Sequence, residues 1–526
     1  MNNFPLISIL RILLLTLITN SSLSALHAKE GEFNCNFQWN NIGNFLVLSK
    51  NGDTLVCLLQ TENSAVLSVQ SLSKKTSTTQ NITIPNGPED YLDNIKIGNI
   101  SHDGRYLALY KTGFVSGAGK PSREYKSFAQ YLIVDLKSGS IENISKRFPK
   151  ECNSKVGKFS SDSQFFVFGV GSSSFIVDPE RKKPPVHGGC DVATLGHYRY
   201  QLSDSHLQRL GNEEMQKTSF VADFHFNADN NKVLHLGGSV EQSLVSDLKT
   251  AETLLVDSTA FNEQAIPESG IIHLGFINDE SMLGQMKMSS EEDPNIAQGK
   301  TKYSLVATDI NNKKYQVLHS INVDQSSQIS PFLALKQSPS GRFVSFSSFE
   351  NQALTGIEKQ GMFLLDTSSM KVIKTFDKQY IKFRFTPDET GVVMSDAEEL
   401  VYISTDGAKR HTYDTYDKKL RVSTGSRRLD NLNIVGDQLF YVNATKFGNC
   451  GLRPGTSLYS IPIQNGQLTR VSKQLKDTCG VFIVNVNDNQ DKIYYVSFQE
   501  SGKSFGVYEV DITNPEYTSK QLFVSK

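Results

Sequence analysis

A polar turn followed by an apolar strand recurs along the chain. It reads SKNGDTLVCL from Ser49, SHDGRYLALY from Ser101 and SPSGRFVSFS from Ser338. Gly, Asn, Asp and Pro are the residues that tight turns favour, and the run that follows is rich in the aliphatic and aromatic residues that suit strands. Each copy therefore predicts a turn and then a strand.

The phrase returns at intervals of about 50 to 65 residues, which indicates a repeat architecture. Less regular copies begin at Ser160, Asn227, Ile277, Thr386, Val435 and Asn487. A short apolar strand precedes each copy, and a further strand that ends in Asp or a similar turn residue follows it, as in YLIVDLKSG from Tyr131. A weaker fourth strand often closes the unit. Four antiparallel strands in a unit of this length are typical of a β-propeller blade.

Such a blade is apolar on both faces, so it is stable only when it stacks against neighbours around an axis. We therefore predict an all-β fold, a single β-propeller. Nine units can be counted between about Phe45 and Phe523, but the outermost units are the least regular. We expect eight four-stranded blades, with seven or nine as alternatives. A split into two domains is a further alternative, although no Pro/Gly/Ser-rich linker marks a boundary.

The phrase S-x-D-G-R-Y-L-A, best seen from Ser101, resembles the repeat of TolB-type and WD-repeat-like propellers of exported bacterial proteins. Similar repeats build the propellers of prolyl-oligopeptidase relatives. The resemblance extends over nearly the whole chain after the N-terminal segment, but only at the level of the blade, and the copy SSDSQFF from Ser160 lacks the Gly. It implies the fold and says little about function, because propellers carry unrelated activities.

The N-terminus predicts export. The apolar run PLISILRILLLTLI from Pro5 is followed by the small and polar stretch TNSSLSALHA, as in a secretory signal with cleavage between Ser24 and Ala28. We assign residues 1–28 to a signal peptide and residues 29–526 to the propeller, which would be periplasmic or extracellular. An uncleaved membrane anchor is the alternative. No later run is long and apolar enough to cross a membrane.

Six cysteines follow the signal segment, an even number that favours disulfides in an exported protein. The repeat places Cys450 and Cys479 on one face of the ring. Cys152 and Cys190 share that face if HYRYQLSD, from His197, is the third strand of its unit. We therefore expect the pairs Cys152–Cys190 and Cys450–Cys479, and by elimination Cys35–Cys57. Buried free thiols are the alternative.

Charge and motifs exclude several classes of function. The chain has 54 Lys and Arg against 55 Asp and Glu, so nothing favours nucleic acid or an anionic membrane as a partner. The G-x-S-x-G, H-E-x-x-H and phosphate-loop motifs are absent, and a single Trp does not suit a sialidase-type propeller. We therefore assign no catalytic residue, expect no cofactor, and favour a protein that is not an enzyme.

One group of residues suggests a metal or proton-switch site. In VADFHFNADNNKVLHLGG, a turn centred on Asn230 places His225 opposite His235 and beside Asp223. Directly opposed side chains are close enough to share a metal ion. The alternative, which we favour, is a hydrogen-bonded polar seam between blades.

Long insertions fall between the second and third strands of several units, namely Lys111–Phe128, Gly171–Gly196, Met286–Lys300 and Asn443–Gly455. In a propeller these connections share one face, and loops on a rigid scaffold are where binding residues gather. The first, second and fourth insertions should rim the central channel and bind an acidic peptide or a sugar acid. Their candidate ligand-binding residues are Lys120, Arg123, Tyr125, His187, Lys446 and Arg453.

The leading hypothesis is a non-enzymatic exported propeller that binds a protein or peptide partner through this face. The alternative is an enzyme or lectin that acts on a glycan or a peptide in the central funnel. An enzyme requires titratable groups that converge at the axis, whereas a binding module requires only a broad exposed surface.

Overall fold

The protein is described here by a computed structural model. The described residues are 46–49, 51–60, 65–72, 79–84, 91–116, 124–149, 152–177, 187–188, 190–211, 223–227, 231–236, 242–257, 271–278, 280–312, 314–324, 328–338, 340–351, 358–376, 382–395, 400–413, 432–450, 453–463, 469–471, 478–487, 489, 491–499, 505–514 and 516–524. Over these residues the fold is all-β, with two short 3-10 turns, η2 (Ile144–Arg147) and η3 (Val192–Thr194). None of the described segments is a helix of the length and apolarity that a membrane span requires.

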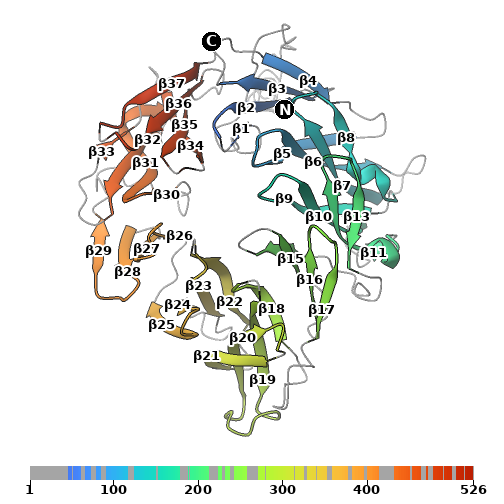
Figure 1. The fold of residues 1–526 in the computed structure, drawn as a ribbon, viewed down its shortest axis with the longest axis vertical. Helices are drawn as coiled ribbons and strands as arrows, with labels where there is room; N and C mark the ends of the chain where they lie inside the picture. The colour runs from blue at the N-terminus through green and yellow to red at the C-terminus, as the bar shows by residue number, and fades with distance from the viewer. Residues whose placement is uncertain are drawn as a thin grey trace, which may run out of the picture.

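The strands fall into nine consecutive blades arranged around an axis (Figure 1). Blade 1 comprises β1 (Leu46–Leu48), β2 (Thr54–Gln60), β3 (Ala65–Ser71) and β4 (Thr79–Ile84). Blade 2 comprises β5 (Tyr91–Ile100), β6 (Tyr106–Ser116), β7 (Glu124–Asp135) and β8 (Ile141–Asn143). Blade 3 comprises β9 (Cys152–Phe159), β10 (Phe165–Val177), β12 (Gly196–Gln201) and β13 (Leu207–Leu210), with the two-residue β11 (His187–Gly188) added to β10.

The next three blades have the same antiparallel order from the innermost strand outwards. Blade 4 comprises β14 (Asp223–Phe226), β15 (Lys232–Leu236), β16 (Gln242–Asp247) and β17 (Thr253–Asp257). Blade 5 comprises β18 (Ile271–Phe276), β19 (Ser281–Ser289), β20 (Lys300–Asp309) and β21 (Lys314–Asp324). Blade 6 comprises β22 (Gln328–Gln337), β23 (Phe343–Asn351), β24 (Glu358–Asp366) and β25 (Lys371–Phe376).

The last three blades complete the ring. Blade 7 comprises β26 (Lys382–Phe385), β27 (Gly391–Ser395), β28 (Leu400–Ser404) and β29 (Arg410–Tyr413). Blade 8 comprises β30 (Leu432–Val435), β31 (Gln438–Cys450), β32 (Arg453–Pro462) and β33 (Thr469–Arg470). Blade 9 comprises β34 (Thr478–Val486), β35 (Lys492–Gln499), β36 (Phe505–Asp511) and β37 (Ser519–Val524).

The predicted propeller fold is confirmed, but the expected count of eight blades is wrong by one. Nine, one of the two alternatives, is the observed number. The copy of the phrase at Ser49, at the irregular N-terminal end of the repeat, forms a complete blade with its own four strands. HYRYQLSD supplies the third strand of blade 3, as predicted, because β12 pairs with β10.

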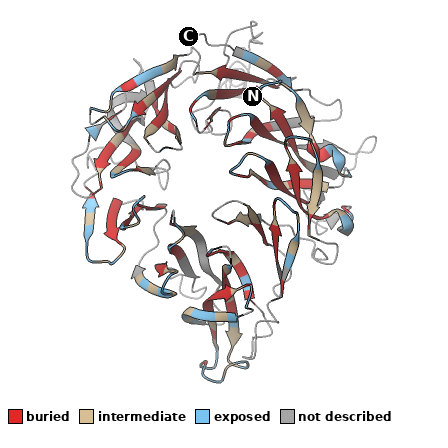
Figure 2. Ribbon diagram, in the orientation of Figure 1, coloured by how far each residue is buried: buried red, intermediate tan, exposed pale blue. Residues whose placement is uncertain are grey.

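Apolar side chains between neighbouring blades hold the ring together. Buried residues lie along the strands of the blades (Figure 2). Among the described residues, each of the nine interfaces between consecutive blades has a cluster of buried apolar side chains. Between blades 2 and 3, for example, Tyr131 packs against Phe166 and Phe168. Fully burying one such aromatic or aliphatic side chain stabilises the fold by about 1.5–3 kcal/mol.

Blades 1 and 9 close the ring through side chains. Leu55 and Cys57 of blade 1 pack with Val496 and Phe505 of blade 9. Asn485 adds a polar contact, because its Nδ2 donates to the Ser49 carbonyl at 2.9 Å. Each of the two blades is built from one continuous part of the chain, and none of the described strands is shared across the closure.

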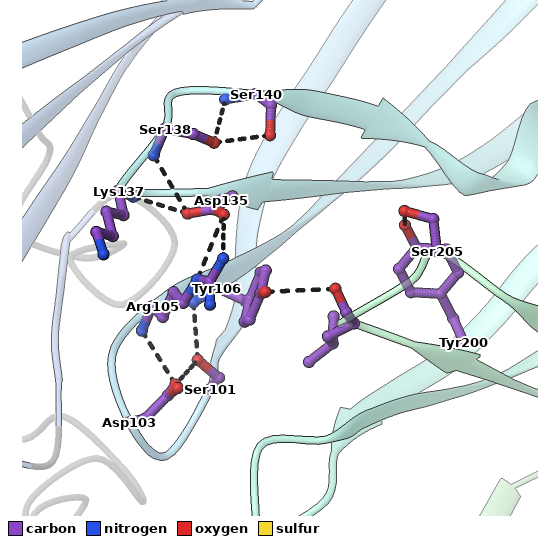
Figure 3. Close-up of polar contacts among 11 residues, drawn as sticks. Ser101, Asp103, Arg105, Tyr106, Asp135, Lys137, Ser138, Ser140, Tyr200 and Ser205 are labelled. Carbon is purple, nitrogen blue, oxygen red and sulfur yellow. Dashed lines mark hydrogen bonds and ion pairs between the residues drawn. The ribbon is translucent and has the colours of Figure 1, made fainter.

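The recurring phrase is explained by one hydrogen-bond pattern between the first and second strands. Ser101 Oγ accepts from the Tyr106 amide at 2.8 Å and donates to Asp103 Oδ1 at 2.6 Å (Figure 3). The same carboxylate oxygen accepts from the Arg105 amide at 3.1 Å. Gly104 has a φ of 73°, which glycine adopts without strain. A short oxygen-bearing side chain accepts the equivalent amide proton at Ser49, Ser160, Asn227, Ser338, Thr386 and Asn487.

The Arg of the phrase and the Asp at the end of the third strand form an ion pair. Arg105 Nη2 lies 2.9 Å from Asp135 Oδ2 in blade 2, and Arg342 makes the same contact at 3.9 Å with Asp366 in blade 6. Burial raises the pKa of Asp135, but hydrogen bonds from Arg105 and from two turn amides outweigh burial and lower this pKa below its usual value. These contacts fix the outer turn of the blade.

Replacing Ser101 by Ala tests the turn. The side chain is fully buried, so Ser101→Ala leaves the Tyr106 amide without its acceptor, and we expect a loss of about 1–3 kcal/mol in the free energy of unfolding. Ser101→Thr is the matched control, since Thr386 makes the same bond in blade 7. Urea unfolding of the two variants measures the difference, and equal midpoints would contradict the assigned role.

Candidate functional site

Blades 2 and 3 are joined by main-chain pairing as well as by packing. The β6–β7 ladder continues to Ser116 opposite Tyr125, and the end of β10 pairs with the start of β7, with Ile176 opposite Tyr125. β11 pairs with β10, with Ser174 opposite His187. Residues 114–116, 124–127, 173–177 and 187–188 therefore form a small sheet in the order β6, β7, β10, β11, which we call the hairpin sheet. Much of the first two insertions, expected as loops, is strand.

The structure brings two of the six predicted ligand-binding residues together. Tyr125 and His187 pair with Ile176 and Ser174, which are two residues apart on β10, so both occupy register positions on one face of the hairpin sheet. Lys120 and Arg123 lie outside the described residues.

The other two predicted residues belong to a different part of the ring. Lys446 lies on β31 and Arg453 begins β32, so both are in the long hairpin of blade 8. This hairpin lies across the ring from β7 and β10 (Figure 1). The six residues therefore do not form one cluster.

A disulfide between Cys152 and Cys190 fixes the base of the hairpin sheet. Cys152 begins the innermost strand β9, and Cys190 lies 38 residues further along the chain, just after β11. Their Cα atoms are 4.8 Å apart. Cys57 is also disulfide-bonded. The side chains of Cys450 and Cys479 lie outside the described part of the structure, so Cys35–Cys57 and Cys450–Cys479 remain predictions.

The predicted pairing of His225 with His235 is wrong by one residue. Asn227 accepts from the Lys232 amide, so the turn has the five-residue spacing of the Ser101 turn, and the ladder places His225 opposite Leu234. His235 lies opposite Phe224 and belongs to the other face of the sheet. His225, His235 and Asp223 were the predicted metal ligands. Because His235 is on the other face from His225, the three do not share one face of the sheet. Among the described side chains, no group of three or more His, Cys, Asp or Glu is placed to hold a metal.

His235 instead contacts a histidine of the neighbouring blade, in agreement with the polar-seam alternative. Its Nδ1 lies 2.7 Å from His197 Nδ1 on β12, and its Nε2 lies 2.7 Å from Ser246 Oγ on β16. A serine bonded to a histidine that is oriented by a third group is the arrangement of a nucleophile and its base. Ser246 is fully buried within the blade, however, so a substrate carbonyl cannot reach it in this structure.

Polar side chains on the innermost strands link neighbouring blades near the axis. Asn99 Nδ2 donates to the Gly157 carbonyl at 2.8 Å, and Lys158 Nζ donates to the Phe224 carbonyl at 3.3 Å. Lys336 Nζ reaches the Phe383 carbonyl of blade 7 at 3.4 Å. These residues were not predicted from the sequence, although the sequence contains a signal for them. A polar residue lies two positions before the turn residue in six blades, namely Asn99, Lys158, His225, Lys336, Arg384 and Asn485.

The innermost strands also reach solvent. They have blades on both sides and a second strand behind them, so an exposed side chain in the middle of such a strand faces the axis. Val156 on β9 is 39% exposed and Ile272 on β18 is 44% exposed. Arg384 on β26 is exposed, and Lys96 on β5 and Lys155 on β9 are half-buried.

The charges on these strands are of one sign among the described side chains. The cations are Lys96, Lys155, Lys158, Lys336 and Arg384, and no described carboxylate side chain accompanies them on the same strands. Asp93 and Asp223 also belong to innermost strands, but their side chains lie outside the described part. The described axial surface therefore combines positive charge with exposed apolar groups.

Lys155 is the most constrained of these cations. Lys155 and Val156 form a β-bulge, because two residues lie between Ser154 and Gly157 where β10 has only one. Bulges redirect side chains away from the regular alternation. The Lys155 stem lies against Gly171, where a Cβ would come within 2.8 Å of Lys155 Cε. Burial lowers the pKa of the ammonium group.

Comparison with known proteins gives fold neighbours only. No family model and no curated protein matches the chain. Among solved structures, Porphyromonas gingivalis dipeptidyl peptidase 4 is 11% identical, with 93% of this chain and 60% of that chain covered and a TM-score of 0.43. A prolyl endopeptidase is 12% identical, with 82% and 56% covered and a TM-score of 0.36. An oligogalacturonate lyase in complex with manganese is 10% identical, with 80% and 99% covered and a TM-score of 0.34.

These neighbours correct the leading functional hypothesis. All three are named as enzymes, which contradicts the expectation of a non-enzymatic binding module. The chain spans 60% and 56% of the first two proteins, so the activity of either as a whole is not carried over. At these identities the likeness extends to the propeller fold, while the TolB-type resemblance has no matching family model.

Removing the Cys152–Cys190 disulfide tests how the hairpin sheet is held. We expect Cys152→Ser/Cys190→Ser to lose about 2–4 kcal/mol of unfolding free energy, because the open chain regains loop entropy when it unfolds. Guanidinium unfolding measures the loss, and limited proteolysis should locate the first new cleavage between residues 171 and 190. An unchanged midpoint together with an unchanged cleavage pattern would contradict this role.

Proposed function

We propose that this chain is the propeller of a protein that acts on a glycan or a peptide, and that it holds a negatively charged substrate at the axis of the ring. The observation that carries the proposal is the set of cations on the innermost strands, with no described carboxylate beside them. Ammonium and guanidinium groups in a partly desolvated setting form charge-assisted hydrogen bonds to carboxylates. The exposed Val156 and Ile272 offer apolar contact for a sugar ring or a side chain.

Lys155 and Arg384 are the proposed anchors. Arg384 presents a planar donor fork that suits a carboxylate, and its exposed side chain is accessible. Lys155 is held by its bulge, by the contact with Gly171 and by the nearby disulfide at Cys152, so it loses little freedom when a ligand binds. We propose that two hairpin regions contact the two ends of the substrate, one through Lys120, Arg123, Tyr125 and His187 and the other through Lys446 and Arg453.

We also propose that the protein is exported, to the periplasm or the extracellular space. The apolar N-terminal run followed by small polar residues supports this, with residues 1–28 as the signal peptide. A disulfide between Cys152 and Cys190 is consistent with an oxidising compartment.

Binding of defined anionic probes tests the function. We expect the protein to bind tetragalacturonate or tetraglutamate, and to bind neither the methyl ester of that oligosaccharide nor tetraglutamine, in calorimetric titrations. The two acidic probes separate a glycan from a peptide substrate, and release of reducing ends or of free amines identifies turnover. Failure of every acidic probe to bind at low ionic strength would contradict the proposal.

Substitution of the anchors locates the site. Lys155→Met removes one charge-assisted hydrogen bond, so the Kd for the bound acidic probe should rise about 10- to 100-fold. Arg384→Met should act in the same direction. Lys371→Met is the matched control, because Lys371 is exposed on the outermost strand of blade 6. An equal effect of the control would place the binding site elsewhere.

A further inference from the structure

The interface between blades 3 and 4 contains a buried contact between two histidines. His197 on β12 is 4% exposed and His235 on β15 is 7% exposed. Their Nδ1 atoms lie 2.7 Å apart and their ring centroids 4.7 Å apart. A buried His–His hydrogen bond thus joins the third strand of one blade to the second strand of the next.

A separation of 2.7 Å between two ring nitrogens requires one proton between them, so one ring donates and the other accepts. The contact continues through blade 4, because His235 Nε2 meets Ser246 Oγ and Ser246 Oγ meets Thr253 Oγ1, each at 2.7 Å. Thr253 is half-buried on the outermost strand of the blade. Both ring nitrogens of His235 therefore have a partner, and a row of hydroxyl groups connects the pair to the outer part of the blade.

Blade 3 also contributes charged groups to this interface. Among the described residues these are Arg199, two positions along β12, and Lys158 on β9, whose Nζ donates to the Phe224 carbonyl. The Phe224 ring packs edge-on against His197 at 5.4 Å. Asp247, at the end of β16, interacts with Arg199. Burial lowers the pKa of His235 well below its usual value, and His197 adds to this effect.

We propose that the His197–His235 contact is an acid-labile joint of the ring, which loosens the seam between blades 3 and 4 below about pH 6 while the interfaces that lack a buried histidine hold. The seam is the set of contacts that Lys158, His197 and Arg199 of blade 3 make with Phe224, His235 and Leu248 of blade 4. At a pH above the usual histidine pKa of about 6.5, a histidine that the fold keeps neutral does not lower the free energy of unfolding. Below that value the unfolded or opened form takes up the proton first, so the stability of the seam falls as the pH falls.

The joint is local because the neighbouring interface is held differently. Blades 2 and 3 share main-chain pairing and lie beside the Cys152–Cys190 disulfide, whereas the described residues of blades 3 and 4 meet through side chains. Opening the seam would also separate the Lys158 ammonium from the Phe224 carbonyl. Acid therefore changes the position of one axial cation, whatever ligand the axis binds.

Hydrogen exchange resolved by mass spectrometry tests the joint in the ligand-free protein. After correction for intrinsic rates, we expect amides of β12, β14 and β15 to exchange at least ten-fold faster at pH 5.0 than at pH 7.5, while β35 and β36 change little. His235→Gln should remove this pH dependence. His273→Gln should keep it, because His273 is buried in blade 5 beside Thr308 and takes no part in the seam.

Three outcomes would overturn the proposal. The first is a wild-type seam that exchanges equally at both pH values, and the second is an acid response of equal size in all blades. The third is an undiminished response in His235→Gln. If that variant does not fold, His197→Gln replaces it, and the wild-type map alone still decides whether the response is confined to the seam.

Discussion

Both faces of a blade are apolar, so no blade of this protein is stable without a neighbour on each side. The nine apolar clusters follow from this requirement, one at each interface. Because the interfaces close into a ring, the innermost strands surround the axis. Each of them is the inner edge of its blade, with no further strand on the side of the axis. Side chains there are released from core packing, and this freedom permits an axial surface of Lys96, Lys155 and Arg384.

Local chemistry explains which parts of the fold were predictable. The phrase from Ser101 specifies its own turn through the hydroxyl, the carboxylate of Asp103 and the positive φ of Gly104, so strands and repeat could be read directly from the sequence. The blade count was harder, because copies such as that at Ile277 have lost the polar pattern. The register at Asn227 was predictable in principle, since its side chain accepts the same amide bond as Ser101 Oγ.

The sequence pattern within one repeat does not predict which residues of different blades contact each other. The pairing of β7 with β10 joins residues from two units, and nothing in the alternation of either strand indicates it. The partner of His235 is His197, 38 residues away on another blade, so the histidines were grouped with the wrong neighbours. The polar residues two positions before the turn were visible as a regular exception in apolar strands, but their carbonyl acceptors lie on the next blade.

The closure of the ring has a consequence for how the protein is made. The contact between Asn485 and the Leu48–Ser49 segment joins residues 437 and 436 positions apart, and the apolar faces of blades 1 and 9 meet at the same place. During synthesis, blade 1 must therefore wait with one apolar face uncovered until almost the whole chain has emerged. Such late, long-range contacts make folding slow and expose the nascent chain to aggregation, so efficient production would depend on a chaperone that shields that first face.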